Sequence, residues 1–177
     1  MIQKIVTRLA RPDDISALHR LIESAYRGDS AKRGWTHEAD LLGGQRTDPD
    51  KLAEIIADTD HHMLVAEQNG ALVGCVDVTR VDDRRCYLGM LTVDPEMQAN
   101  GLGRQLMTAA EEAASTHFSA DVMEMTVIKQ RAELIAYYER RGYVQTGEMR
   151  PFPLDDERFG LPKTRELEFV VLEKKLA

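Results

Sequence analysis

The stretch that decides the fold reads Gln98-Ala99-Asn100-Gly101-Leu102-Gly103-Arg104. It follows an apolar, strand-like run from Leu88 to Val93 and opens a helix-forming stretch that reaches Phe118. Glycines let the backbone approach a ligand closely, and the free N–H groups at a helix N-terminus attract phosphate. A strand, a short loop with two glycines and a helix N-terminus therefore predict a binding pocket for a pyrophosphate group.

Two common phosphate-binding loops do not fit this stretch. A P-loop needs GxxxxGK followed by Ser or Thr, which the sequence lacks, and a dinucleotide fingerprint needs GxGxxG directly after a strand. Here Leu106 stands where the third glycine belongs, and Gly101 comes eight positions after Val93. A coenzyme A site is the third interpretation, and its alternative is a structural helix cap without a ligand.

Two motifs resemble those of the GNAT family of N-acetyltransferases. The segment from Gln98 to Gly103 matches the family signature (R/Q)xxGx(G/A), which follows a strand end of the form V-x-P, and Ala136 to Tyr143 resembles the family's F-Y-E-K-x-G-F segment. The resemblance implies a single domain over residues 1–177 with the α/β acyl-CoA N-acyltransferase fold. In that fold a mixed, mostly antiparallel central sheet of about seven strands carries helices on both faces, and the fourth strand splays from the fifth.

The hydrophobic pattern along the chain agrees with this order of elements. Asn69-Gly70 between two apolar runs is a strong hairpin signal, so the first part of the sheet is expected to be antiparallel. A strand–helix–strand passage over residues 86–128 implies one parallel pair of strands. The sequence predicts strands at about residues 2–8, 62–67, 71–79, 85–93, 122–128, 143–149 and 167–172, and helices that begin near residues 12, 36, 49, 102 and 131.

The resemblance implies that coenzyme A contacts one strand and one loop. The pantetheine arm would lie between the splayed strands and pair with the backbone of Leu91, Thr92 and Val93, as an added strand would. Arg104 either contacts the coenzyme or is a solvated helix residue, and Arg131 either reaches the coenzyme or caps the next helix. The N–H groups that would hold the pyrophosphate belong to Gln98, Ala99, Asn100, Gly101, Leu102, Gly103 and Arg104.

Tyr138 matches the family tyrosine that protonates the departing thiolate of coenzyme A, whereas Tyr137 fills the preceding aromatic position. In this reaction an amine attacks the thioester carbonyl and a thiolate leaves, so a phenol with a pKa near ~10 is a suitable proton donor. A backbone N–H near Val93 is the expected donor to the oxyanion. The alternative for Tyr138 is an amphipathic-helix tyrosine without a chemical role.

The general base is the main departure from the family pattern. Many relatives carry a glutamate on the fourth strand, but this chain has Tyr87-Leu88-Gly89-Met90 there. Glu124, a charge inside an apolar strand, is the candidate base, and an exposed structural carboxylate is its alternative. A chain of water molecules or an amine that is already neutral would serve as well.

Four residues are candidates for acceptor binding: Tyr26, Trp35, Glu38 and Asp40. An aromatic ring beside carboxylates can hold an ammonium group through cation–π and charge interactions. The alternative is a buried tryptophan that anchors a loop, with two acids that favour a helix start. The acidic segment from Pro151 to Pro162 is expected to be a lid or an edge-protecting loop.

Composition excludes several classes of protein. The formal charge of −7 over 177 residues disfavours nucleic acid as a partner, and no apolar run is long enough to span a membrane. Cys75 and Cys86 form no CxxC pair, which favours a reducing, cytoplasmic setting. We expect the protein to be a monomer or a homodimer. His61 and His62 lack further ligands at suitable spacing, so we expect no metal and treat them as loop residues.

These observations predict an acetyl-CoA-dependent N-acetyltransferase, which moves an acetyl group to a primary amine by direct attack in a ternary complex. No cysteine lies in the expected pocket motif, which disfavours an acyl-cysteine intermediate. The preferred acceptor is a small-molecule amine. Two alternatives stay open: a non-catalytic acyl-CoA-binding sensor or assembly module, and an acetyltransferase for protein N-termini or lysines.

Overall fold

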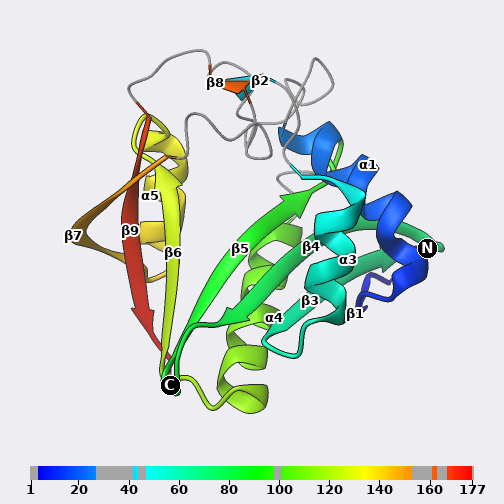
Figure 1. Ribbon diagram of the computed structural model, residues 1–177, viewed down its shortest axis with the longest axis horizontal. Coiled ribbons are helices and arrows are strands. Elements are labelled where there is room, and N and C mark those ends of the chain that lie inside the picture. Colours follow the sequence, from blue (N-terminus) through cyan, green and yellow to red (C-terminus); the bar gives the residue numbers. More distant parts are fainter. Residues whose placement is uncertain are drawn as a thin grey trace.

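The computed structural model describes residues 4–26, 42–43, 47–97, 101–152, 161–162 and 167–176. Figure 1 shows the arrangement of its helices and strands. The strands are β1 (Val6–Leu9), β2 (Leu42–Gly43), β3 (His61–Gln68), β4 (Ala71–Arg80), β5 (Arg85–Val93), β6 (Val122–Ile128), β7 (Val144–Pro151), β8 (Leu161–Pro162) and β9 (Glu168–Lys175). The helices are the short 3-10 turn η1 (Pro12–Asp14), α1 (Ile15–Tyr26), α3 (Pro49–Ala57), α4 (Leu102–His117) and α5 (Ala132–Arg140). The strands predicted at 85–93 and 122–128 are confirmed to the residue, whereas the helix predicted near residue 36 falls outside the described ranges.

Seven strands form one sheet in the order β1-β3-β4-β5-β6-β9-β7. Neighbouring strands are antiparallel except for β5 and β6, which run parallel because α4 carries the chain back between them. The predicted mixed, mostly antiparallel sheet is therefore confirmed. Among its strands, β5 and β6 are the fourth and fifth in chain order.

The strands β5 and β6 pair only at one end. Their ladder joins Arg85–Tyr87 to residues 122–124, after which β5 continues against β4 and β6 continues against β9. The backbone of Met90 has a φ of 53°, and the β4–β5 register shifts between Cys75 and Asp77. Such a bulge bends a strand. Figure 1 shows β5 and β6 diverging beyond the paired end, so the expected splay is present.

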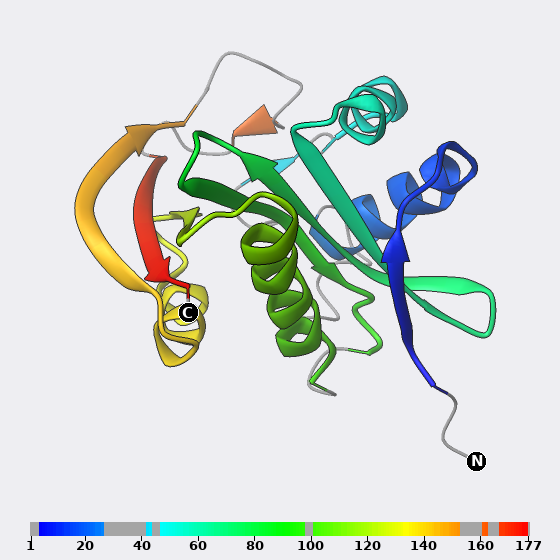
Figure 2. The same cartoon turned by 90° about the horizontal axis from the view of Figure 1, so that it is seen from below.

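Helices cover both faces of the sheet, as predicted. Alternate residues of β4 point to opposite faces, so Val76 and Val78 join the core under α4 and α5, whereas Cys75 joins the core under α1 and α3. Figure 2 shows α4 on one side of the sheet and α1 and α3 on the other. Each face of the β3–β4–β5 half of the sheet is therefore buried by its own helices.

Helix α4 begins directly after the glycine loop. Its N-cap residue Gly101 has a φ of 78°, a left-handed conformation that glycine adopts without strain. The buried stripe of the helix comprises Leu102, Leu106, Met107, Ala110 and Ala114. None of the described helices is long and apolar enough to cross a membrane.

Candidate active site

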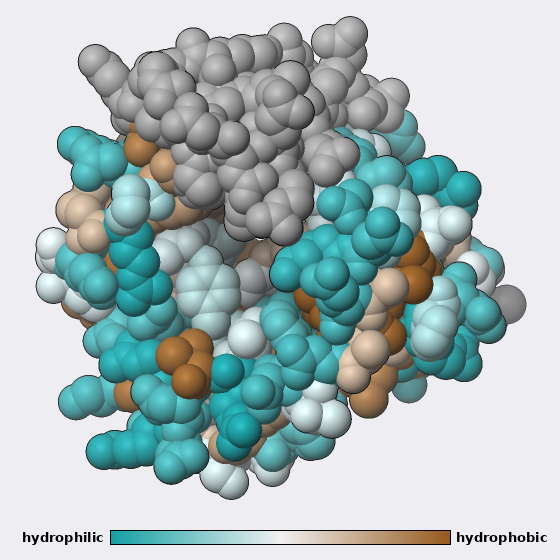
Figure 3. Space-filling model, in the orientation of Figure 1, coloured by the Kyte–Doolittle hydropathy of each residue, from teal (hydrophilic) through white to brown (hydrophobic). Residues whose placement is uncertain are grey.

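A cavity of about 320 Å³ lies where β5 and β6 diverge. From one face of the sheet it is lined by Tyr26 of α1 and Ile55 of α3, and from the other by Leu134 and Tyr138 of α5. Figure 3 shows the surface hollowed between the two halves of the molecule on the face that carries α1 and α3. The cavity thus connects the two faces of the sheet, and its volume suits a small ligand or one part of a larger ligand.

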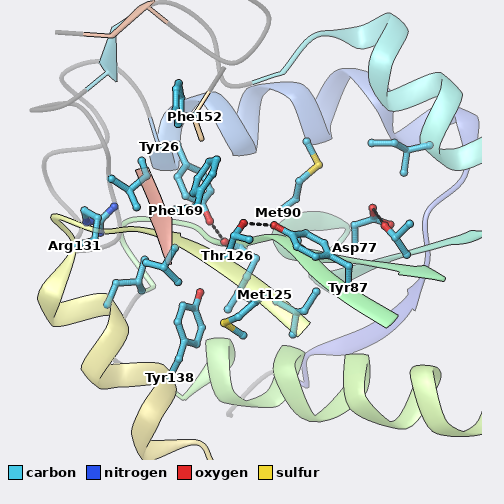
Figure 4. Close-up of a pocket in the computed structure, with 18 residues that line it drawn as sticks. Tyr26, Asp77, Tyr87, Met90, Met125, Thr126, Arg131, Tyr138, Phe152 and Phe169 are labelled. Carbon is cyan, nitrogen blue, oxygen red and sulfur yellow. Dashed lines mark hydrogen bonds between the residues drawn. The ribbon is translucent and has the colours of Figure 1, made fainter. Parts of the chain in front are cut away.

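Tyr138 lies on the α5 side of this cavity. The side chain is 7% exposed, and Figure 4 shows its hydroxyl pointing from α5 into the cavity. Burial raises the pKa of Tyr138 well above its ordinary value, so the phenol keeps its proton at neutral pH. Its neighbour Tyr137 does not line the cavity and instead stacks under the guanidinium of Arg141, 4.6 Å from the ring centre.

Tyr26 lies on the opposite side of the cavity, at the end of α1. Its hydroxyl donates a hydrogen bond to the carbonyl of Leu91 and ties α1 to the edge of β5 that faces the gap. Of the four candidate acceptor-binding residues, Tyr26 therefore lines the cavity. The other three, Trp35, Glu38 and Asp40, belong to a segment that the structure leaves undescribed.

Beyond Tyr87 the backbone of β5 faces the gap. Asp94 N–H donates to Val73 O over 2.8 Å, so residue 94 points toward β4. Successive residues of a strand alternate in direction, which turns the N–H and C=O groups of Leu91 and Val93 toward the gap. The backbone of Thr92 points toward β4, and its hydroxyl donates to Met90 O over 2.8 Å.

The glycine loop is described from Gly101 onward, so Gln98, Ala99 and Asn100 are not placed. A Cβ atom built on Gly103 would lie 3.2 Å from the hydroxyl of Tyr137, which shows how closely α5 approaches the start of α4. Four cationic side chains line a second hollow beside these two helices: Arg104, Arg140, Arg141 and Lys174. Lys174 is paired with Glu111 there, at 2.7 Å.

Arg131 lines the main cavity from the N-terminal end of α5. It is the N-cap residue of that helix, but its side chain makes no capping hydrogen bond. Its side chain belongs to the cavity lining, and Figure 4 shows it on the same side of the cavity as Tyr138.

Glu124 occupies a different site. One of its oxygens pairs with Arg150 at 2.7 Å and the other with Arg85 at 3.1 Å, and Arg85 also pairs with Glu173. These residues line a charged hollow beside the main cavity, and this hollow lies between β4 and β5 on one side and β6, β7 and β9 on the other. Both oxygens of Glu124 are occupied by arginines, so the contacts favour a structural role, and we do not carry it forward as the base.

The sequence reasoning missed the pair formed by Asp77 and His61. Asp77 lines the main cavity, is 5% exposed, and accepts a hydrogen bond from His61 Nδ1 over 2.7 Å. The treatment of His61 and His62 as loop residues is wrong, because both belong to β3. The overlooked signal was an acid inside the otherwise apolar run from Leu72 to Val78. In the described ranges, no three His, Cys, Asp or Glu side chains gather in a group that could hold a metal ion.

Comparison with known protein families shows to which family this chain belongs. The model of the acetyltransferase (GNAT) domain matches residues 35–152, which is more than half of the chain. The chain belongs to the GNAT acetyltransferase family. Members of this family are N-acetyltransferases that take the acetyl group from acetyl-CoA, and this GNAT chain is accordingly an N-acetyltransferase. No curated protein gives a significant match.

Solved structures of GNAT enzymes share the fold at low sequence identity. The ribosomal-protein-S18-alanine N-acetyltransferase of Escherichia coli superposes with a TM-score of 0.71 at 16% identity, over 98% of this chain and 95% of that one. Spermidine N-acetyltransferase of Vibrio cholerae, solved with CoA and spermine, gives 0.69 at 18% identity, over 97% and 95%. Nourseothricin acetyltransferase gives 0.69 at 20% identity, over 98% and 99%.

Proposed function

We propose that this GNAT enzyme transfers the acetyl group of acetyl-CoA to a primary amine of a small molecule by direct attack in a ternary complex. The observation that carries the proposal is the cavity at the β5–β6 splay, which is lined from both faces of the sheet. A donor that approaches from the α4 and α5 face and an acceptor that approaches from the α1 and α3 face would meet there.

The donor side is suited to coenzyme A. The gap-facing backbone groups of Leu91 and Val93 would pair with the pantetheine amides as an added strand. The N-terminus of α4 at Gly101 would hold the pyrophosphate, and the cationic hollow that contains Arg104 and Arg141 lies next to it for the remaining phosphate charge. Arg131 points into the cavity from the same face and would contact the coenzyme rather than cap α5.

Tyr138 would act as the general acid. The amine nitrogen attacks the thioester carbon, the C–S bond breaks, and the leaving thiolate takes the phenol proton. The attacking nitrogen loses its extra proton to solvent, which leaves the neutral amide, and the phenolate recovers a proton from solvent. Burial raises the pKa of Tyr138, and a thiolate formed in the same low-dielectric cavity would be destabilised as well, which favours transfer of the phenol proton to it.

A covalent route through cysteine has no support in the structure. Cys75 and Cys86 are both buried and neither lines the cavity. Burial raises the pKa of Cys86 to about 11, which keeps it a thiol rather than a nucleophilic thiolate at neutral pH. Direct attack by the amine is therefore the mechanism that we propose.

The small size and the apolar and aromatic lining of the cavity favour a small acceptor over a peptide. The spermidine enzyme of Vibrio cholerae, which shares the fold, was solved with a small amine, spermine. The ribosomal-protein enzyme of Escherichia coli shares the fold equally well, so an acetyltransferase for protein N-termini is the second candidate.

The test is thiol release from acetyl-CoA over a panel of primary amines, with Tyr138→Phe as the variant. We expect the loss of the general acid to lower kcat by a factor of about 10². The matched control is Tyr143→Phe, which also removes a buried hydroxyl next to Tyr138 but does not line the cavity, and its kcat should stay within about twofold of wild type. An unchanged kcat in Tyr138→Phe would disprove the assignment. Tight CoA binding without turnover on any amine would instead favour a sensor.

A further inference from the structure

Asp77 is placed where an acceptor would enter. It lies in the middle of β4 on the face that carries α1 and α3, since its neighbours Val76 and Val78 point to the opposite face. Directly across from it on β5 is Gly89, which has no side chain to cover the carboxylate. The carboxylate therefore borders the cavity although it is only 5% exposed.

Among the residues that the structure describes, hydrogen-bond donors contact only one of the two carboxylate oxygens of Asp77. Oδ2 accepts hydrogen bonds from His61 Nδ1 at 2.7 Å and from Thr79 Oγ1 at 3.2 Å. Oδ1 is buried and has no hydrogen-bond partner among the residues that the structure describes. A buried carboxylate oxygen without a donor is costly, so this arrangement fits a site whose missing donor is supplied by a ligand.

The surroundings of Asp77 favour a cationic donor. Tyr87 lies beside it on β5 and leans over Gly89, because a Cβ atom built on Gly89 would be 3.1 Å from Tyr87 Cε1. The hydroxyl of Tyr87 hydrogen-bonds to Thr126 across the splay, which holds the ring in place (Figure 4). A carboxylate beside a fixed aromatic ring binds an ammonium group better than a neutral hydrogen-bond donor.

We propose that Asp77 binds a second, non-reacting ammonium group of the acceptor, so that the substrates of this enzyme are amines with two cationic nitrogens. The proposal rests on the function proposed above and names its acceptor class. A nitrogen hydrogen-bonded to a carboxylate is held in its charged form, whereas the nitrogen that attacks the thioester must be neutral. The nitrogen on Asp77 is therefore not the reacting one. In Figure 4, Asp77 and Tyr138 lie at opposite ends of the cavity lining, which leaves the reacting nitrogen to the Tyr138 end.

The test compares n-pentylamine with 1,5-diaminopentane, which share a five-carbon chain and differ by one ammonium group. With wild type, kcat/KM for the diamine should exceed that for the monoamine by about tenfold or more. Asp77→Asn keeps the size of the side chain and its hydrogen bond with His61 but removes the charge. In this variant the KM for the diamine should rise about tenfold, while kcat/KM for the monoamine stays within about threefold. Asp60→Asn, which removes an exposed carboxylate paired with Arg80 outside the cavity, should leave the preference intact.

Two results would overturn the proposal. One is equal kcat/KM for the two amines with wild type. The other is an equal loss of kcat for both amines in Asp77→Asn, which would place Asp77 at the reacting nitrogen. If neither amine is acetylated, the proposed function fails, and calorimetric binding of the diamine in the presence of CoA still tests the site. Equal affinities of wild type and Asp77→Asn in that titration would refute it.

Discussion

The two sides of the cavity are built in different ways. On the α4 and α5 side, the surfaces proposed for coenzyme A are mostly backbone: the edge of β5 that faces the gap and the N-terminus of α4 at Gly101. On the α1 and α3 side, the cavity is defined by single side chains such as Tyr26, Asp77 and Tyr87, which come from three different elements. Backbone groups do not change with the sequence, so the α4 and α5 side suits one invariant acetyl donor. On the α1 and α3 side, single substitutions can change which acceptor amine binds.

The largest effect is expected from a substitution on the donor side. In Gly74→Ala the new Cβ would lie 2.9 Å from Thr92 O and 2.8 Å from Leu106 Cδ1, so β4, β5 and α4 would have to shift. We expect a loss of about 2–3 kcal/mol in the free energy of unfolding, measured by urea denaturation. The KM for acetyl-CoA should rise as well, while the ratio of kcat/KM between diamine and monoamine stays constant. Ala71→Val, at an exposed position of the same strand, should change stability by less than about 0.5 kcal/mol.

A smaller effect, confined to the acceptor side, is expected from pH. The hydrogen bond to Asp77 raises the pKa of His61 above its ordinary value of 6.5; Asp58 also raises it, whereas burial and Lys51 lower it. Below that raised pKa, His61 is cationic and cancels the charge of Asp77; above it, the pair is anionic and attracts an ammonium group.

The ratio of the KM for 1,5-diaminopentane to that for n-pentylamine should therefore rise about fivefold as the pH falls through the pKa of His61. Steady-state kinetics with both amines measures it, because the titration of the reacting nitrogen cancels in the ratio. His61→Asn keeps an N–H donor for Asp77 but cannot titrate, so its ratio should be flat. A pH-dependent ratio in that variant would contradict the role of His61.

The smallest effect is expected outside both sides of the cavity, at Glu124. Glu124→Gln removes the charge that pairs with Arg85 and Arg150. Because the side chains of the two arginines are 29% and 37% exposed, water can replace part of the lost interaction, and we expect a loss of about 1 kcal/mol in stability. Neither kcat nor its pH profile should change by more than about twofold. A large fall in kcat with loss of the acidic limb of its pH profile would restore Glu124 as the base.

The difference between the two sides of the cavity also explains which parts of the site could be predicted from the sequence. The glycine loop and Tyr138 are each embedded in a contiguous motif, and the splay follows from the order of elements, so this part could be read from the chain. Asp77 meets His61 and Tyr87 only through the register of three strands, which local patterns do not define. Glu124 looked like a free charge in a strand for the same reason, since its arginines come from β5 and β7. Segment 27–41 offered no motif strong enough to assign an acceptor.

The short ladder between β5 and β6 divides the sheet into two halves that are joined at one end. Three residue pairs, starting at Arg85 and Val122, the hydrogen bond between Tyr87 and Thr126 and the ion pair between Arg85 and Glu124 join the two strands. Among the described residues, the core under α4 and α5 packs both halves on one face of the sheet. A pantetheine arm laid along the edge of β5 that faces the gap would extend the contact between the two halves. Coenzyme A would then act as a structural tie as well as a reactant, and part of its binding energy would go into the rigidity of the domain.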